Sequence, residues 1–267
     1  MAWPGSVAPR PAYIDAIAVY LKPRVLIVMF FGFSSGLPLA LSGTTLLVWM
    51  RESGVDLGTI GLFALVGTPY TVKFLWAPLT DALDVPFLGR WLGRRRGWLV
   101  FTQLLLIAAI VFLGSTDPAS APALVALGAL LVAAASATQD IVVDAFRVES
   151  LPENEQAAGM ASYVAAYRIG MLVSTAGALF LVSAIQAYGF DKQASWHWGY
   201  VAMAGLVLIG TVTALVATEP ERSRAAEAEH ARQKPLARIA AAAIGAFKDF
   251  LSYEMAFVML SFVVLFK

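Results

Sequence analysis

The stretch Thr138–Ser150, TQDIVVDAFRVES, closes one of the most apolar segments of the chain. It places Asp140 and Asp144 four residues apart, with Arg147 three residues further on. Residues four apart share one face of a helix, so both carboxylates point the same way. A charged group near the middle of a membrane span costs about 2.5–3.5 kcal/mol on insertion scales. The stretch therefore predicts a membrane helix whose carboxylates face protein or water rather than lipid.

The composition assigns the chain to the membrane proteins. Of its 267 residues, 59% are hydrophobic and 14% are charged, and the mean hydropathy is +0.73. A soluble domain has about a quarter of its residues charged. The net charge of +1 and the lack of a basic stripe argue against nucleic-acid binding. With no cysteine and two histidines, we expect no disulfide, metal site or cofactor.

A window of about 20 apolar residues locates the spans. It predicts six, near residues 25–50, 57–80, 98–115, 122–146, 158–187 and 198–218. A seventh apolar segment starts near Tyr253 and reaches Lys267, which is short of a full span. We therefore predict an all-α membrane protein, truncated early in a seventh helix. The predicted parts are an N-terminal arm (1–24), a six-helix transmembrane half (25–218), a polar linker (219–250) and the start of that seventh helix (251–267).

The loops predict the orientation. Fourteen Lys and Arg residues fall in the N-terminal arm and the even-numbered connections, and only Arg51 and Lys192 fall on the other side. Positive residues concentrate in cytoplasmic loops. We therefore expect the N-terminus and the 219–250 linker to be cytoplasmic.

Spans two, four and five carry charge: Lys73, then Asp140 and Asp144, then Arg168. At similar predicted depth these groups can neutralise one another. In one interpretation the carboxylates pair with Lys73, Arg147 or Arg168 and only hold the spans together. In the other, at least one is a proton or substrate site in an aqueous cavity. We favour the second, with Asp140 as the deeper site and Asp144 paired with Arg147, because ionisable residues in membranes are expensive and usually functional.

Arg168 keeps its proton, so it is a good partner either for a carboxylate or for an anionic group on a substrate. Tyr163 and Tyr167 are four residues apart near it, and either pack within the bundle or stack on sugar rings. The third and sixth spans carry no charge and can face lipid.

The first span contains FFGFSSGLPLALSG. Pro38 removes a helix hydrogen bond, and Gly36 softens the helix beside it. This predicts a kink, used either for packing or to line a cavity in which Ser34 and Ser35 offer hydroxyls to a ligand.

Two groups of motifs resemble known families. In APLTDALDVPFLGRWLGRRRGW, Asp81 and the cluster Arg94, Arg95 and Arg96 resemble the cytoplasmic signature loop of the major facilitator superfamily, where acid and base form a latch; we add Arg147 to this latch. The motifs GFSSGLPLAL, YTVKFLWAPLTD and TQDIVVDAFRVE together resemble the AmpG-like muropeptide permeases of that superfamily. The third motif adds Gln139 to the candidate site.

The resemblance implies the N-terminal half of a symporter, not an enzyme. Such a permease imports anhydromuropeptides, which are anionic glycopeptides, across the bacterial cytoplasmic membrane for peptidoglycan recycling. Its partners would be substrate, protons, the lipid bilayer and a missing C-terminal half, with Lys267 a cavity residue of the whole protein. The charges at matched depth lead us to the further hypothesis that Asp140 takes a proton from outside, loses a salt bridge to Arg168 and frees that arginine for the substrate.

Several alternatives stay open. One is a permease for another polar anionic solute, as in the acetyl-coenzyme A transporters, and another is a half-transporter that works as a dimer. A seven-span receptor or light-driven pump would need a lysine in mid-span where this chain has Lys267 at its end. An intramembrane enzyme would need a Ser/Lys pair or two aspartates on facing helices, which the spans do not offer.

Overall fold

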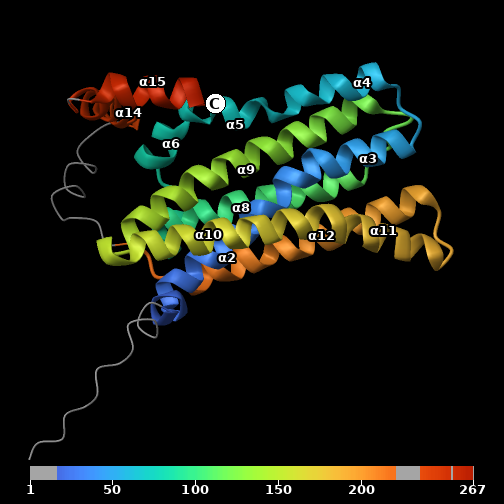
Figure 1. Ribbon diagram of the computed structural model, residues 1–267, viewed down its shortest axis with the longest axis horizontal. Coiled ribbons are helices and arrows are strands. Elements are labelled where there is room, and N and C mark those ends of the chain that lie inside the picture. Colours follow the sequence, from blue (N-terminus) through green and yellow to red (C-terminus); the bar gives the residue numbers. More distant parts are fainter. Residues whose placement is uncertain (1–16, 221–234, 254, 267) are drawn as a thin grey trace, which may run out of the picture.

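The computed structural model describes residues 17–220, 235–253 and 255–266. Most of the predicted N-terminal arm, residues 221–234 of the predicted linker, and Lys267 lie outside this part. The described residues form helices and no strand (Figure 1). The α-helices are α2 (Pro23–Ser42), α3 (Thr44–Glu52), α4 (Leu57–Leu62), α5 (Thr68–Val72), α6 (Ala77–Ala82), α7 (Leu88–Leu92), α8 (Arg94–Gly114), α9 (Pro122–Ser150), α10 (Glu153–Leu172), α11 (Ala178–Ala187), α12 (Lys192–Val216), α14 (Pro235–Leu251) and α15 (Ala256–Phe266).

Six stretches are long and apolar enough to cross a membrane. They are Pro23–Glu52, Leu57–Leu75, Arg94–Gly114, Pro122–Ser150, Glu153–Ala187 and Lys192–Val216. Their number and order agree with the six predicted spans, and the all-α membrane fold is confirmed. The amphipathic helix α14 packs against α6, and α15 follows it (Figure 1).

Three of the six spans are interrupted. The first continues through Gly36 and Pro38 and breaks at Gly43, with φ −106° and ψ −108°, between α2 and α3. The interruption thus lies five residues after Pro38. The second span alternates short α and 3-10 pieces around Pro69. The fifth contains a π-helical segment, Val173–Gly177, between α10 and α11.

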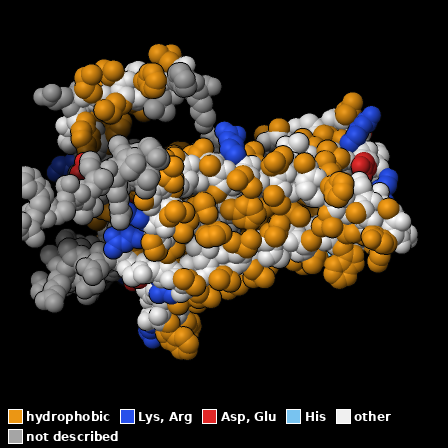
Figure 2. Space-filling model, turned by 60° about the horizontal axis from the view of Figure 1, so that its bottom comes forward, with side chains coloured by type: hydrophobic (Ala, Val, Ile, Leu, Met, Phe, Trp, Pro, Cys, Tyr) orange, Lys and Arg blue, Asp and Glu red, His pale blue; other side chains and the backbone are white. Residues whose placement is uncertain are grey.

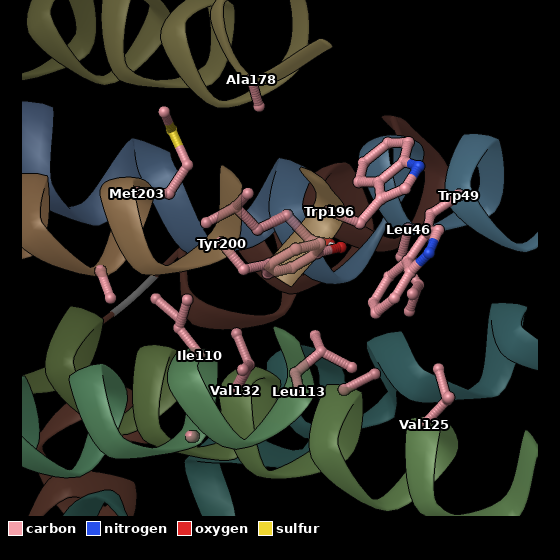
Figure 3. Close-up of a cluster of buried hydrophobic side chains, with 14 of the residues drawn as sticks. Leu46, Trp49, Ile110, Leu113, Val125, Val132, Ala178, Trp196, Tyr200 and Met203 are labelled. Carbon is pink, nitrogen blue, oxygen red and sulfur yellow. Dashed lines mark hydrogen bonds between the residues drawn. The ribbon is translucent and has the colours of Figure 1, made fainter. Parts of the chain in front are cut away.

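The core at one end of the bundle is aromatic (Figure 3). Trp49 of α3 stacks on Trp196 of α12, with ring centroids 5.6 Å apart. Tyr200 packs beside both rings and donates a hydrogen bond to the Leu41 carbonyl at 3.0 Å. Leu113 of α8 and Val125 of α9 belong to the same cluster. This packing joins the first, third, fourth and sixth spans.

Helices α2 and α10 lie side by side at a distance that only glycine allows. A Cβ added to Gly32 would overlap the Tyr163 carbonyl, and one added to Gly36 would overlap the Tyr167 carbonyl. Across the same contact, a Cβ on Gly170 would overlap the Phe33 carbonyl. Small residues that let backbones approach closely are typical of membrane helix pairs.

The six spans differ in how much of them is covered. In an apolar 18-residue window of each span, only 11% of the residues are buried in the second span and 22% in the fifth, against 50–67% in the others. Helix α8 packs between α9 and α12 and buries Gln103 completely, so the third span, which is uncharged from Trp98 on, has a packed face as well as an exposed one. Figure 2 shows hydrophobic side chains along the length of the bundle, with charged side chains mainly towards its ends.

Candidate substrate and coupling site

The centre of the site is an ion pair between the second and fourth spans. The Asp140 carboxylate of α9 lies 3.9 Å from Lys73 Nζ, which belongs to the 3-10 turn Lys73–Leu75. The Asp140 side chain is 12% exposed and that of Lys73 is 33% exposed. Asp140 Oδ1 is buried and has no hydrogen-bond partner among the described residues. The pair therefore combines a carboxylate that is mostly shielded with a cation that is open on one side.

Ser35 and Gln139 extend the site towards the first span. Gln139 Nε2 of α9 donates a hydrogen bond to Ser35 Oγ of α2 at 3.0 Å, and both residues are buried. The rings of Tyr163 and Tyr167 are 6.0 Å apart on α10, and both hydroxyls are close enough to Asp140 to interact with its charge. The structure thus brings four spans together around one carboxylate.

Ser34 lies apart from this group. Its hydroxyl is 3.3 Å from Gln103 Oε1 of α8, and both side chains are completely buried. A Cβ added to Gly210 of α12 would overlap both groups. Ser34, predicted as a ligand group, therefore belongs to a polar contact between the first, third and sixth spans.

The arginines of the site differ from expectation. Arg168 is exposed on α10, and no described carboxylate lies within the 4.0 Å ion-pair distance of it. The salt bridge predicted between Asp140 and Arg168 is therefore absent, because Lys73 from the second span takes that place. Asp144 pairs with Arg147 at 3.3 Å, as the sequence suggested. Arg147 also contacts Met160 Sδ at 3.0 Å.

A second charged group occupies the end of the bundle opposite the aromatic core, which we call the arginine-rich end after Arg94, Arg95 and Arg96. Arg95 Nη1 lies 2.7 Å from Asp81, and Arg95 Nη2 lies 2.5 Å from Glu149. Arg94 also contacts both acids. The structure thus joins the predicted latch residues Asp81, Arg94 and Arg95.

Two predicted latch residues lie elsewhere in this region. Arg96 binds backbone carbonyls at the end of α12, and Arg147 pairs with Asp144 rather than with Asp81. Sequence reasoning missed Glu149, although it lies in the stretch Thr138–Ser150 together with Asp140 and Asp144. It also missed Glu219, which bonds to the start of α8, and Gln103. The spacing in sequence, 54 residues from Glu149 to Arg95, gave no signal for these contacts.

The described ranges contain no group of three His, Cys, Asp or Glu side chains that could hold a metal ion. The site consists instead of one ion pair, neutral hydrogen-bonding groups and two tyrosines. Such a set can bind a proton or a polar solute.

Comparisons with known proteins give the family. The family model described as Major Facilitator Superfamily matches residues 24–266. The chain is 44% identical over 204 residues to the anhydromuropeptide permease of Escherichia coli (strain K12), covering 76% of this chain and 39% of that protein. It is 31% identical over 249 residues to a Rickettsia felis protein that carries the name AmpG 4, covering 93% of this chain and 57% of that protein.

The chain thus spans about two fifths to three fifths of the length of these relatives. The resemblance to AmpG-like permeases is confirmed, and the similarity is to transporters rather than to enzymes. A family model that matches nearly the whole of the chain establishes that it belongs to the major facilitator superfamily.

Proposed function

We propose that this chain forms the N-terminal half of a proton-coupled permease that imports anhydromuropeptides for peptidoglycan recycling. The observation that carries the proposal is the shielded Asp140–Lys73 pair, set among hydrogen-bonding and aromatic groups in a chain similar to a named anhydromuropeptide permease.

The geometry supports a coupling step at Asp140. Protonation of its carboxylate from outside removes the charge that holds Lys73, 3.9 Å away. Lys73 is then free to bind an anionic group of the substrate, and the unpaired Arg168 offers a second cation on α10. When the proton leaves Asp140 towards the cytoplasm, the ion pair re-forms and the substrate loses that contact. Lys73 thus replaces Arg168 as the group released by protonation.

We infer that further membrane helices cover the second and fifth spans. These spans are the least buried, yet they carry Lys73 and the exposed Arg168. Charged side chains that faced hydrocarbon would cost several kcal/mol. Protein or a water-filled cavity on this side removes that cost, and a C-terminal half of the same permease would supply both.

We place the protein in the bacterial cytoplasmic membrane, with its N-terminus and its arginine-rich end on the cytoplasmic side. The distribution of Lys and Arg supports this orientation.

Uptake tests the proposal. Cells that lack a permease of their own would make this chain alone, or joined to the part of the Escherichia coli permease that the match does not cover. We expect the joined form to take up labelled anhydromuropeptide and a protonophore to abolish that uptake. Asp140→Asn is expected to lower uptake at least about a hundredfold, a typical contribution of a proton-transfer group. Partly exposed Asp117, in the α8–α9 loop, gives the matched control Asp117→Asn, expected to retain uptake.

Three results would contradict parts of the proposal. Unchanged proton-driven uptake by Asp140→Asn would remove Asp140 from coupling. Uptake by the chain alone would favour a half-transporter that works as a dimer. Absence of uptake by a folded joined form would favour another polar anionic solute, for which the two cations Lys73 and Arg168 remain suited.

A further inference from the structure

The third and sixth spans cap each other at the arginine-rich end. The backbone N–H groups of Arg95 and Arg96, in the first turn of α8, donate to the two carboxylate oxygens of Glu219 at 2.8 and 2.9 Å. In return, the Arg96 guanidinium donates to the carbonyls of Ala214 and Leu215, at the end of α12. Each helix end thus receives the charge that it lacks.

This exchange answers an electrostatic conflict in the sequence. The start of a helix carries a partial positive charge and its end a partial negative one. Helix α8 begins with three arginines and has no acid in its first turn, and α12 has no base in its last turn. Glu219 supplies the missing anion to α8, and Arg96 supplies the missing cation to α12.

The residue before α8 is shaped for this contact. Gly93 has φ +89°, a conformation that side chains rarely adopt. A Cβ at Gly93 would overlap the Glu219 carboxylate group. The backbone therefore leaves room for the Glu219 side chain at that point.

The cap is connected directly to the charged group at this end of the bundle. The Glu219 carboxylate accepts a hydrogen bond from the backbone N–H of Arg95. The Arg95 side chain binds Asp81 near the end of α6 and Glu149 near the end of α9. The Arg95 side chain is only 5% exposed. One residue therefore links four helices, and its backbone is fixed by an acid at the point where the chain leaves the sixth span.

We infer that Glu219 is a positioning residue for closure of the arginine-rich end: it holds the first turn of α8 so that Arg95 can bind Asp81 and Glu149 together. This role goes beyond the proposed transport function, and it can be tested without a substrate. Opening of this end requires the Arg95 contacts to separate, so loss of the Glu219 cap shifts the equilibrium towards the open form.

The test uses a single reporter cysteine. The chain has none of its own, and Ala82, next to Asp81, is 4% exposed. In the purified Ala82→Cys protein we expect slow maleimide labelling. Glu219→Gln is expected to raise the labelling rate about tenfold and to speed hydrogen exchange of the Arg95 and Arg96 amides. The reason is that a neutral side-chain amide replaces the carboxylate that accepts two charge-assisted hydrogen bonds. Glu153→Gln, an exposed acid in the first turn of α10, is the matched control and should change neither.

Faster amide exchange with unchanged labelling would overturn the inference, since Glu219 would then only cap α8. Unchanged values in both measurements would overturn it as well. Gly93→Ala provides a second variant in case Glu219→Gln does not fold. It displaces the Glu219 side chain without changing any charge, and we expect the same two increases; unchanged labelling in this variant would also contradict the inference. Because no substrate enters the experiment, its failure leaves the muropeptide proposal to be judged by uptake.

Discussion

At the scale of single residues, the two neighbouring serines of the first span have different surroundings. Successive residues of a helix point about 100° apart, so one serine can serve a site while the next serves packing. Ser35 accepts a hydrogen bond from Gln139 beside Asp140, whereas Ser34 contacts Gln103 between the third and sixth spans. The sequence SS marked both as candidates and could not separate them, because the difference depends on which helices pack on each face.

The serine pair provides a matched test of the site. Ser35→Ala is expected to lower uptake about tenfold, since the Gln139 amide beside the proton site loses its partner, an effect of about 1–1.5 kcal/mol. Ser34→Ala is expected to leave uptake nearly unchanged and to reduce the free energy of unfolding by about 1 kcal/mol. Uptake by the transport-competent form and thermal unfolding in detergent measure the two effects. A larger loss of uptake in Ser34→Ala would move the site towards α8.

At the scale of elements, the contact between α2 and α10 determines where the tyrosines lie. Because Gly32 and Gly36 have no Cβ, the carbonyl groups of Tyr163 and Tyr167 can lie directly against the α2 backbone. The same backbone contact positions both tyrosine hydroxyls so that they interact with the charge of Asp140. Gly36, which the sequence marked as a residue that softens the helix, is thus also a point of close contact between α2 and α10.

Gly36→Ala is therefore expected to be destabilising. The new methyl group meets the Tyr167 carbonyl, and overpacking of this kind costs about 1–3 kcal/mol. Gly205→Ala in α12 is the control, because nothing lies within 4 Å of its added Cβ and alanine favours a helix by about 1 kcal/mol over glycine. Thermal unfolding should separate the two variants. Equal stability of Gly36→Ala and the original chain would show that α2 and α10 can move apart at little cost.

The elements also show what a sequence of this kind determines. Hydropathy alone predicted six spans in the right order, because a length of apolar residues is a property of one helix at a time. The irregular second span was not predicted, since its short α and 3-10 pieces depend on packing between helices. For the site, the sequence identified Lys73 and Asp140 as candidates because a charge in a membrane span has a high insertion free energy. The sequence could not show that Lys73 rather than Arg168 pairs with Asp140, because that depends on how the second, fourth and fifth spans pack.

At the scale of the whole molecule, the bundle has two chemically different ends. One end is closed by the stacked Trp49 and Trp196, with Trp196 also donating to Glu52 at 3.1 Å. The other is held by Arg95 and its two acids. The Asp140–Lys73 pair lies in the spans that connect these ends, where a transported solute would have to pass.

The orientation of these two ends can be tested directly, because the chain contains no cysteine. Trp91 in α7 is 90% exposed at the arginine-rich end, and Ala119 is exposed in the loop between α8 and α9. If the arginines hold their end in the cytoplasm, an impermeant maleimide should label Ala119→Cys in intact cells. Trp91→Cys should be labelled only after the membrane is permeabilised. Labelling of Trp91→Cys in intact cells would show that the protein has the opposite orientation. A proton from outside would then have to reach Asp140 from the arginine-rich end.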